Sequence, residues 1–407
     1  MKILHTSDWH LGKRLHQADL IDDQRHFTEW LVNMVKAEQV DVVLIAGDVF
    51  DLANPSSEAR KIYYETLVEL SRMNCTTIIT GGNHDAPTVL NAPKEILRAL
   101  NIHVVGGLPE DPREMIIPVE GRQKGDRAVI AAIPFLRDAD LRNAVPGESH
   151  EDRREAVKAG ITGIFDQVAR ICREDYPGLP AIAMGHLFAR GADVSESERD
   201  IQVGNQAPYE PEHFNSHFDR LALGHIHKPQ PAESSGRARY SGSPLPLSFS
   251  ERADHKKVII YQTNNGTFNA HSITIPVVRR LKKIQGSLQH IRQVLNQPQE
   301  EDGLLPTLIE VEMVEEQEDP QKITDLENLI DDFNNPRAQV VKHRVHFKNM
   351  ISGTNQLYDS SQHIENLRPA DVFEKKLERS GLGQRQKELL REAFTEILQA
   401  LEQKESS

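Results

Sequence analysis

Residues that can bind metal ions or move protons follow several apolar segments of the chain. Five of these segments end in a small residue and then in Asp, Asn or His side chains. The ligand-type residues at these ends are Asp8, His10, Asp48, Asn83, His186, His225 and His227. Two carboxylates, one amide and four imidazoles are too many for one ion but suit two, with a carboxylate such as Asp48 between them. Oxygen and nitrogen ligands without thiolate favour Mn, Fe, Zn or Co over Cu(I).

The spacing of these residues gives them a common direction. Asp8 and His10 are two positions apart, as are His225 and His227, so in an extended chain each pair points to one side. Glycines precede several of the ligand types and permit tight turns and close approach of the backbone. Two metal ions about 3.5–4 Å apart are the usual arrangement for hydrolysing phosphate esters. The sequence therefore predicts a two-metal phosphoesterase centre.

The segments that carry these residues alternate with helical patterns, which is typical of an α/β domain. Apolar spacing predicts helices over 25–36 and 57–73. A β-hairpin is predicted from 257–262 and 268–275, which flank the turn-like Asn264-Asn265-Gly266. Because sites in open α/β sheets form at the carboxyl ends of strands, the five segment ends should meet in one cleft. The predicted strands are 2–6, 40–46, 76–80, 102–105, 128–133, 181–184 and 220–223.

The character of the chain changes near Pro276. Strands predicted at 308–313 and 339–347 flank a predicted helix at 321–333, which indicates a small α+β unit. A polar stretch at 349–366 then precedes helical patterns at 369–380 and 384–403. The last of these carries one apolar stripe, which either folds back on the α+β unit or binds a partner. We therefore expect three parts, with boundaries at 1–275, 276–348 and 349–407.

Composition limits the classes of function. The net charge of −13 is not that of a protein that grips nucleic acid by charge alone, so cations must act locally. Two cysteines without a CxxC motif argue against a disulfide framework or a structural zinc cluster. No apolar run reaches membrane-helix length and no signal peptide is visible, so we expect a cytoplasmic protein. The candidate cations are Lys13, Arg14, Arg137, Arg190, Lys228, Arg252 and the cluster 279–283.

The ordered motifs SDWHLG, GDVFD, GGNHD, GH and GHIH resemble the calcineurin-like metallophosphoesterase superfamily. More specifically, SDWHLG near the N-terminus, GDVFD followed by Pro55, IPF at 133–135, ALGHIHKPQ and YSGSPLPLSF at 240–249 resemble the bacterial SbcD family. The resemblance is strong to about residue 275 and continues in layout beyond it. It implies an α/β fold with a four-layer β-sandwich flanked by helices. A small α+β capping domain and C-terminal helices would follow.

The resemblance implies a role for each ligand-type residue. Asp48 would bridge two ions and join both ligand sets. Asp8, His10 and His227 would complete one set, and Asn83, His186 and His225 the other.

Other residues are given roles around the ions. His84 would be an acid outside the ligand set that protonates the leaving 3′-oxygen or stabilises the transition state. Asp85 would either orient His84 or cap the following turn. Gly242 and Ser243 would let the backbone approach a phosphate, with a plain turn as the alternative. Some relatives carry a catalytic histidine where this chain has Asp51, so that role is not carried over.

SbcD is the nuclease subunit of the SbcCD complex, and this sets the expected activity. The resemblance implies a Mn-dependent 3′→5′ double-strand exonuclease and single-strand or hairpin endonuclease, with Mg²⁺ as a weaker substitute. Its partners would be DNA and the coiled-coil ATPase SbcC, within a heterotetramer that holds a homodimer of this chain. The chain lacks a GxxxxGK[ST] motif, so ATP dependence must come from the partner. The protein would act in DNA repair, recombination and replication. It would lie near the nucleoid and would not be bound to a membrane.

Two other functions remain open at this point. A phosphatase or small-molecule phosphodiesterase could use the same fold, although Leu52-Ala53-Asn54-Pro55 and GNHD depart from the protein-phosphatase pattern. A non-catalytic scaffold is the second alternative, and the full ligand set together with His84 argues against it.

Overall fold

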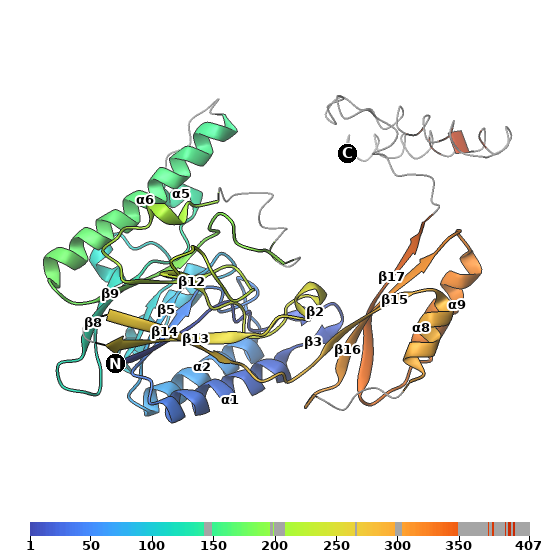
Figure 1. The fold of residues 1–407 in the computed structure, drawn as a ribbon, viewed down its shortest axis with the longest axis horizontal. Helices are drawn as coiled ribbons and strands as arrows, with labels where there is room; N and C mark the ends of the chain where they lie inside the picture. The colour runs from blue at the N-terminus through green and yellow to red at the C-terminus, as the bar shows by residue number, and fades with distance from the viewer. Residues whose placement is uncertain are drawn as a thin grey trace. The chain divides into compact units, whose positions relative to one another are not determined.

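The structure is a computed structural model (Figure 1). It divides into two compact units. The first comprises Met1–Ile284, Pro298–Val311 and Phe333–His343; the second comprises Gln285–Gln297, Glu312–Asp332 and Arg344–Ser407. The predicted polar stretch and most of the two predicted C-terminal helices lie outside the described residues. The structure describes residues 1–141, 149–195, 198, 208–264, 267–297, 303–348 and the single residues 373, 377, 387, 390, 391 and 394.

Two six-stranded sheets form the body of the first unit. The first sheet has the order β14-β13-β1-β4-β5-β6, in which β1, β4, β5 and β6 are parallel and β13 runs antiparallel to β1. Its β13–β14 hairpin confirms the predicted one, while residues 265–266 of the turn lie outside the described ranges. The strands are β1 (Lys2–Thr6), β4 (Val42–Ala46), β5 (Thr76–Thr80), β6 (Ile102–Val105), β13 (Lys257–Asn264) and β14 (Thr267–Thr274).

The second sheet has the order β11-β12-β10-β9-β8-β7. In it β8, β9, β10 and β12 are parallel, and the edge strands β7 and β11 are antiparallel to their neighbours. The strands are β7 (Ile116–Glu120), β8 (Arg127–Ala132), β9 (Ala181–His186), β10 (Arg220–Gly224), β11 (Gln230–Pro231) and β12 (Ala238–Tyr240).

The side chains of β4 show how the layers form. Val42, Leu44 and Ala46 belong to the core that the two sheets share, whereas Val43 and Ile45 belong to the core beneath the helices. This alternation follows from the two-residue period of a strand. Helices α1 (Ile21–Glu38) and α2 (Ser57–Arg72) cover the first sheet, and α6 (His150–Asp175) covers the second (Figure 1). The predicted four-layer α/β sandwich is confirmed.

The remaining elements of the first unit are short. A two-stranded hairpin pairs β2 (Arg14–Leu15) with β3 (Ala18–Asp19) directly after the first ligand segment.

Among the described residues, no helix is long and apolar enough to cross a membrane. The short helices are α3 (Pro87–Asn91), α4 (Lys94–Arg98), α5 (Asp138–Leu141) and the 3₁₀ turns Pro112–Met115, Pro211–His213 and Phe249–Glu251.

Beyond Pro276 the chain forms a three-stranded sheet of order β15-β16-β17. Two helices, α8 and α9, accompany it and contact each other. The predicted strands and helix of this α+β region correspond to β16, β17 and α9, while β15 and α8 were not predicted. The elements are β15 (Leu281–Gly286), α8 (Leu288–Leu295), β16 (Thr307–Glu315), α9 (Pro320–Asp331) and β17 (Ala338–Phe347).

Candidate metal centre

The ends of strands from both sheets meet at the predicted site. Asp8, Asp48 and Asn83 follow β1, β4 and β5 of the first sheet, while His186 ends β9 and His225 follows β10 of the second. The two sets are joined directly, because the His225 amide donates to Asp8 Oδ1 over 2.9 Å. The five strand ends do come together, where the two sheets face each other and not at the edge of one sheet.

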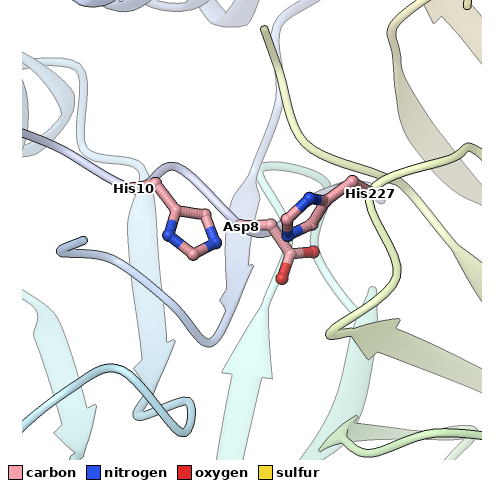
Figure 2. A group of neighbouring side chains, drawn as sticks. All are labelled: Asp8, His10 and His227. Carbon is pink, nitrogen blue, oxygen red and sulfur yellow. The ribbon is translucent and has the colours of Figure 1, made fainter. Parts of the chain in front are cut away.

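Asp8, His10 and His227 form one group of potential ligands. An atom from each lies within 4.8 Å of the others, and all three side chains are buried. The rings of His10 and His227 have centroids 5.1 Å apart and are nearly perpendicular. Figure 2 shows Asp8 and His10 on the loop that follows β1 and His227 on another segment of the chain.

Asp48 connects this group to a second one. Its Oδ2 lies 3.6 Å from His10 Nε2 and 3.3 Å from His186 Nε2. Asn83 completes the second group, because its Oδ1 lies 3.0 Å from His186 Nε2 and 3.1 Å from His225 Nδ1. All seven predicted ligands are therefore brought together, with Asp48 between the two groups.

The residues present fit a pair of divalent cations. His10 Nε2 is buried and, among the described residues, has no hydrogen-bond partner, as expected of a nitrogen that serves an ion. The donor set mixes carboxylate, amide and imidazole groups without thiolate, which suits borderline and hard divalent ions. The fold and this donor set support two divalent metal ions.

The charge states of the ligands differ from one another in the metal-free chain. Burial alone would raise the pKa of Asp48, but the neighbouring His186 ring holds it well below its usual range, so the carboxylate is ionised. Burial lowers the pKa of His10 to about 4 and that of His225 to about 3, which leaves their lone pairs available. For His186, burial is outweighed by Asp48, which raises the pKa to about 9. Burial also raises the pKa of Asp8, against the attraction of nearby histidines.

Oxygen atoms outside the ligand set hold three of the four histidine rings. Each ring turns Nδ1 towards such an oxygen, which fixes its orientation and leaves Nε2 for an ion. The contacts are His10 with Asp51 Oδ1 at 3.2 Å, His186 with the Ala46 carbonyl at 3.0 Å, and His227 with Glu251 Oε1 at 3.6 Å. Glu251 lies 24 residues after His227 and outside any ligand motif, so the sequence did not predict its role.

Two glycines allow the ligand loops to approach closely. A Cβ atom on Gly47 would lie 2.2 Å from His186 Nδ1, and one on Gly82 would lie 2.1 Å from Asp48 Oδ1. Gly47 also has a φ of +82°. Asp8 and Asp48 have positive φ angles of 54° and 48°, which are unusual for residues with a side chain and occur at functional sites. Glycines were predicted to let the backbone approach closely, and these two allow the backbone to lie against the side chains of other ligands.

His84 lies beside the ligands and is half-buried. Its amide donates to Asp48 Oδ1 over 2.9 Å, and its Nδ1 lies 2.9 Å from the carbonyl oxygen of Asp51. Because a carbonyl only accepts hydrogen bonds, Nδ1 carries a proton and Nε2 faces elsewhere. The ring centroid is 4.8 Å from that of His10.

Asp85 takes neither of the two roles expected for it, which were to orient His84 or to cap the following turn. Its carboxylate accepts hydrogen bonds from the amides of Gly82, Val49 and Phe50, at 2.9–3.0 Å. It therefore ties the His84 loop to the Asp48 loop and leaves the His84 ring to the Asp51 carbonyl. Burial, followed by the repulsion of Asp48, raises its pKa to about 6.

Gly242 and Ser243 are also placed differently from the expectation that they approach a phosphate. Both are buried, and Ser243 Oγ donates to the Leu245 carbonyl over 2.8 Å and accepts from Lys256 Nζ over 3.0 Å. A Cβ on Gly242, whose φ is +78°, would lie 2.6 Å from the His227 carbonyl oxygen. These residues support the His227 segment from behind and do not line an open surface.

Several of the candidate cations are engaged within the chain. Lys13 Nζ lies 3.0 Å from Asp51 Oδ1, and Arg137 donates to the Asp85 carbonyl over 3.2 Å. Arg279 pairs with buried Asp23 at 2.8 Å. Lys13 and Arg137 therefore support the loops that carry Asp51 and Asp85, and Arg279 pairs with α1.

Comparisons with known proteins agree with the motifs. The family model described as calcineurin-like phosphoesterase matches residues 1–229. A second model, SbcD_C, described as the Type 5 capsule protein repressor C-terminal domain, matches residues 277–380.

Curated relatives match along most of the chain. A protein of Escherichia coli (strain K12) is 35% identical over 317 residues, which are 77% of this chain and 78% of that protein. A protein of Rhodobacter capsulatus is 38% identical over 69% of this chain and 70% of its own length. One of Bacillus subtilis is 33% identical over 65% and 67%. Each is named as the SbcD subunit of the nuclease SbcCD. This chain belongs to the SbcD family of calcineurin-like phosphoesterases.

Proposed function

We propose that this chain is a nuclease subunit that hydrolyses phosphodiester bonds of DNA with two bound metal ions. One observation carries the proposal: seven ligand-type side chains from five strand ends lie together, and Asp48 lies between a histidine of each group. The relatives named as nuclease subunits support DNA as the substrate. We assign the nuclease domain to 1–275, the capping domain to 276–348 and a linker with partner-binding helices to 349–407.

Asp48 is proposed to bridge the two ions. Asp8, His10 and His227 would hold one of them, and the other three ligands the second. Mn²⁺ is proposed for both positions, with Mg²⁺ as a weaker substitute, because four imidazoles disfavour the harder ion. When bound, such ions activate water and stabilise charge on the phosphate. The ligands of the second ion besides Asp48 are Asn83, His186 and His225.

The residues of the chain supply position and a proton. The bonds from the His84 amide to Asp48 and from its Nδ1 to the Asp51 carbonyl fix the ring beside the ligands. We assign the protonated Nε2 of His84 to the leaving 3′-oxygen. Water adds to phosphorus and releases one proton to the solvent, the bond from phosphorus to that oxygen breaks, and the proton from Nε2 neutralises the leaving group; a proton from the solvent then restores Nε2. Asp85 holds the His84 loop in place through backbone amides.

The membership of the SbcD family supports more specific activities, which we also propose. They are 3′→5′ double-strand exonuclease and single-strand or hairpin endonuclease activity, in concert with an SbcC-type ATPase. A homodimer of this chain within a heterotetramer, and a cytoplasmic, nucleoid-associated setting, belong to the same proposal. The acidic net charge supports the need for a partner that holds the DNA.

Substrate preference tests this function against a phosphatase on the same fold. The purified chain with Mn²⁺ should cut a labelled single-stranded oligonucleotide and should turn over p-nitrophenyl phosphate far more slowly. The matched control is the same chain with a chelator. Rapid turnover of p-nitrophenyl phosphate with intact oligonucleotide would favour the phosphatase.

A further inference from the structure

A buried ion pair lies directly behind the ligand His227. The side chains of Glu251 and Lys256 are 0% and 5% exposed, and Glu251 Oε2 lies 2.6 Å from Lys256 Nζ. Removing two charges from water costs several kcal/mol for each ion, at an order-of-magnitude level, so such a pair needs further partners. Both members of the pair contact His227.

Lys256 holds the main chain at this position. Its Nζ donates to the His227 carbonyl oxygen over 2.9 Å, to Ser243 Oγ over 3.0 Å and to Glu251 Oε2. An ammonium group has three N–H donors, and these three acceptors use all of them. The His227 carbonyl is thereby fixed by a charged donor, which makes a stronger bond than a neutral one.

Glu251 holds the ring of the same residue. Its Oε1 lies 3.6 Å from His227 Nδ1 and accepts a hydrogen bond from Ser248 Oγ over 3.1 Å. Its other oxygen accepts from the Leu247 amide over 3.1 Å, which fixes the carboxylate in turn. A second buried carboxylate, Glu198, accepts from the His227 amide and lies 3.8 Å from Nδ1.

This arrangement determines which nitrogen of His227 can bind an ion. Two buried carboxylates face Nδ1 at 3.6 and 3.8 Å, and acceptors beside Nδ1 favour the tautomer that has its proton on Nδ1 and its lone pair on Nε2. His227 forms one group of potential ligands with Asp8 and His10, and these are the three side chains drawn in Figure 2. Ring and backbone of His227 are each held by one member of the buried pair.

We propose that Glu251 and Lys256 are positioning residues that orient His227 as a metal ligand, Glu251 through the ring and Lys256 through the carbonyl. The inference rests on the proposed metal binding and adds to it residues that lie outside the ligand motifs. Loss of a carboxylate that orients a metal-bound histidine costs about 10–100-fold in metal affinity. The affinity should fall for the ion that His227 binds and should stay unchanged for the other ion.

Calorimetric titration of the metal-free full-length chain with Mn²⁺ tests this. Wild type should bind two ions, while Glu251→Gln should bind one of them about 10–100-fold more weakly and the other unchanged. Lys256→Met should act in the same direction. The matched control is Glu310→Gln, because Glu310 is also a buried carboxylate, 2.9 Å from Lys342 Nζ, but belongs to β16. It should bind both ions as wild type does.

A further variant covers the case in which a single change prevents folding. Glu251→Met with Lys256→Met removes both charges together, which buried pairs often tolerate. Thermal unfolding in metal-free buffer should show a folded protein, and the titration should again show one weakened ion. A folded double variant that binds both ions with wild-type affinity would overturn the inference. If wild type itself binds no Mn²⁺, the proposed function is wrong. That result differs from one in which only the role of Glu251 and Lys256 is wrong.

Discussion

Asp48 is the residue on which the two ligand groups depend. Its carboxylate is within 3.3–3.6 Å of one histidine from each group, and the His186 ring keeps it ionised. We expect Asp48→Asn to weaken both ions, because a neutral amide cannot replace a bridging carboxylate. Metal analysis of the purified variant checks this. Two ions per chain with near-normal turnover would show that Asp48 is not the bridge.

His84 should affect the rate and leave the metal content unchanged. Its amide reaches Asp48, but its ring bonds to the Asp51 carbonyl and is outside the proposed ligand sets. His84→Ser should lower turnover of DNA by about 10²–10⁴-fold, the usual cost of losing a positioned acid. Metal analysis of the same preparation is the control. A fall in bound metal that matches the fall in rate would make His84 a ligand.

Metal binding should release a proton from His186. In the metal-free chain Asp48 raises the pKa of this ring to about 9, so at neutral pH it is protonated, whereas a ligand must be neutral. Affinity for Mn²⁺ should therefore fall as pH drops below about 9, by up to about tenfold per pH unit. Titration calorimetry in buffers of different ionisation enthalpy measures the proton released. A heat independent of the buffer would contradict this charge state.

For single residues, the position predicted from the sequence agrees with the structure where a motif places a ligand directly after a strand. Asp8, Asn83 and His225 could be found because chain direction alone brings them to the strand ends. Ser243 and Asp85 could not be placed correctly, because their hydrogen-bond partners come from distant segments or from the backbone. Glu251 was missed for the same reason.

At the scale of elements, the spacing of apolar residues explains which strands and helices could be predicted and which could not. Apolar residues predicted strands at 2–6, 40–46 and 76–80, and the structure has β1 at Lys2–Thr6, β4 at Val42–Ala46 and β5 at Thr76–Thr80. Helix α6 was not predicted, although its buried Val157, Ile161 and Phe165 follow a four-residue spacing. Charged residues between them dilute the pattern, and only the second sheet shows why that face is buried.

The glycines at strand ends give a prediction for these loops. Gly47→Ala should lower metal affinity and the melting temperature, because its Cβ would displace His186 and the φ of +82° is strained for alanine. Gly178→Ala is the matched control, since Gly178 has a φ of +78° and nothing lies within 4 Å of its Cβ position. Metal titration and thermal unfolding of both variants separate the two effects. Equal losses of metal affinity would show that strain alone is responsible.

At the scale of the whole molecule, the acidic net charge implies that affinity for DNA must be shared with a partner. The apolar stripe predicted within 384–403 is the proposed contact. Removing residues after 348 should preserve β17, bound metal and Mn²⁺-dependent cleavage of single strands, and should abolish co-purification with an SbcC-type ATPase. A pull-down with the ATPase checks this, with full-length chain as control. Undiminished complex formation would place the partner contact elsewhere.

The fold class and the order of the ligand strands could be predicted from the sequence, because both follow from local pattern and chain direction. The pairing of two sheets around one site could not, since it depends on which apolar faces meet. Ala46 illustrates this, as its carbonyl in the first sheet holds His186 of the second. Such contacts over 140 residues are a property of the folded chain alone.

Digestion of an end-labelled DNA hairpin tests the central claim most directly. The chain, combined with an SbcC-type ATPase, ATP and Mn²⁺, should open the hairpin and then shorten the duplex. The same mixture with Asp48→Asn should leave the DNA intact while the ATPase remains active. An intact hairpin with the wild-type, metal-loaded complex, or equal cleavage by Asp48→Asn, would contradict a DNA nuclease built on this two-metal centre.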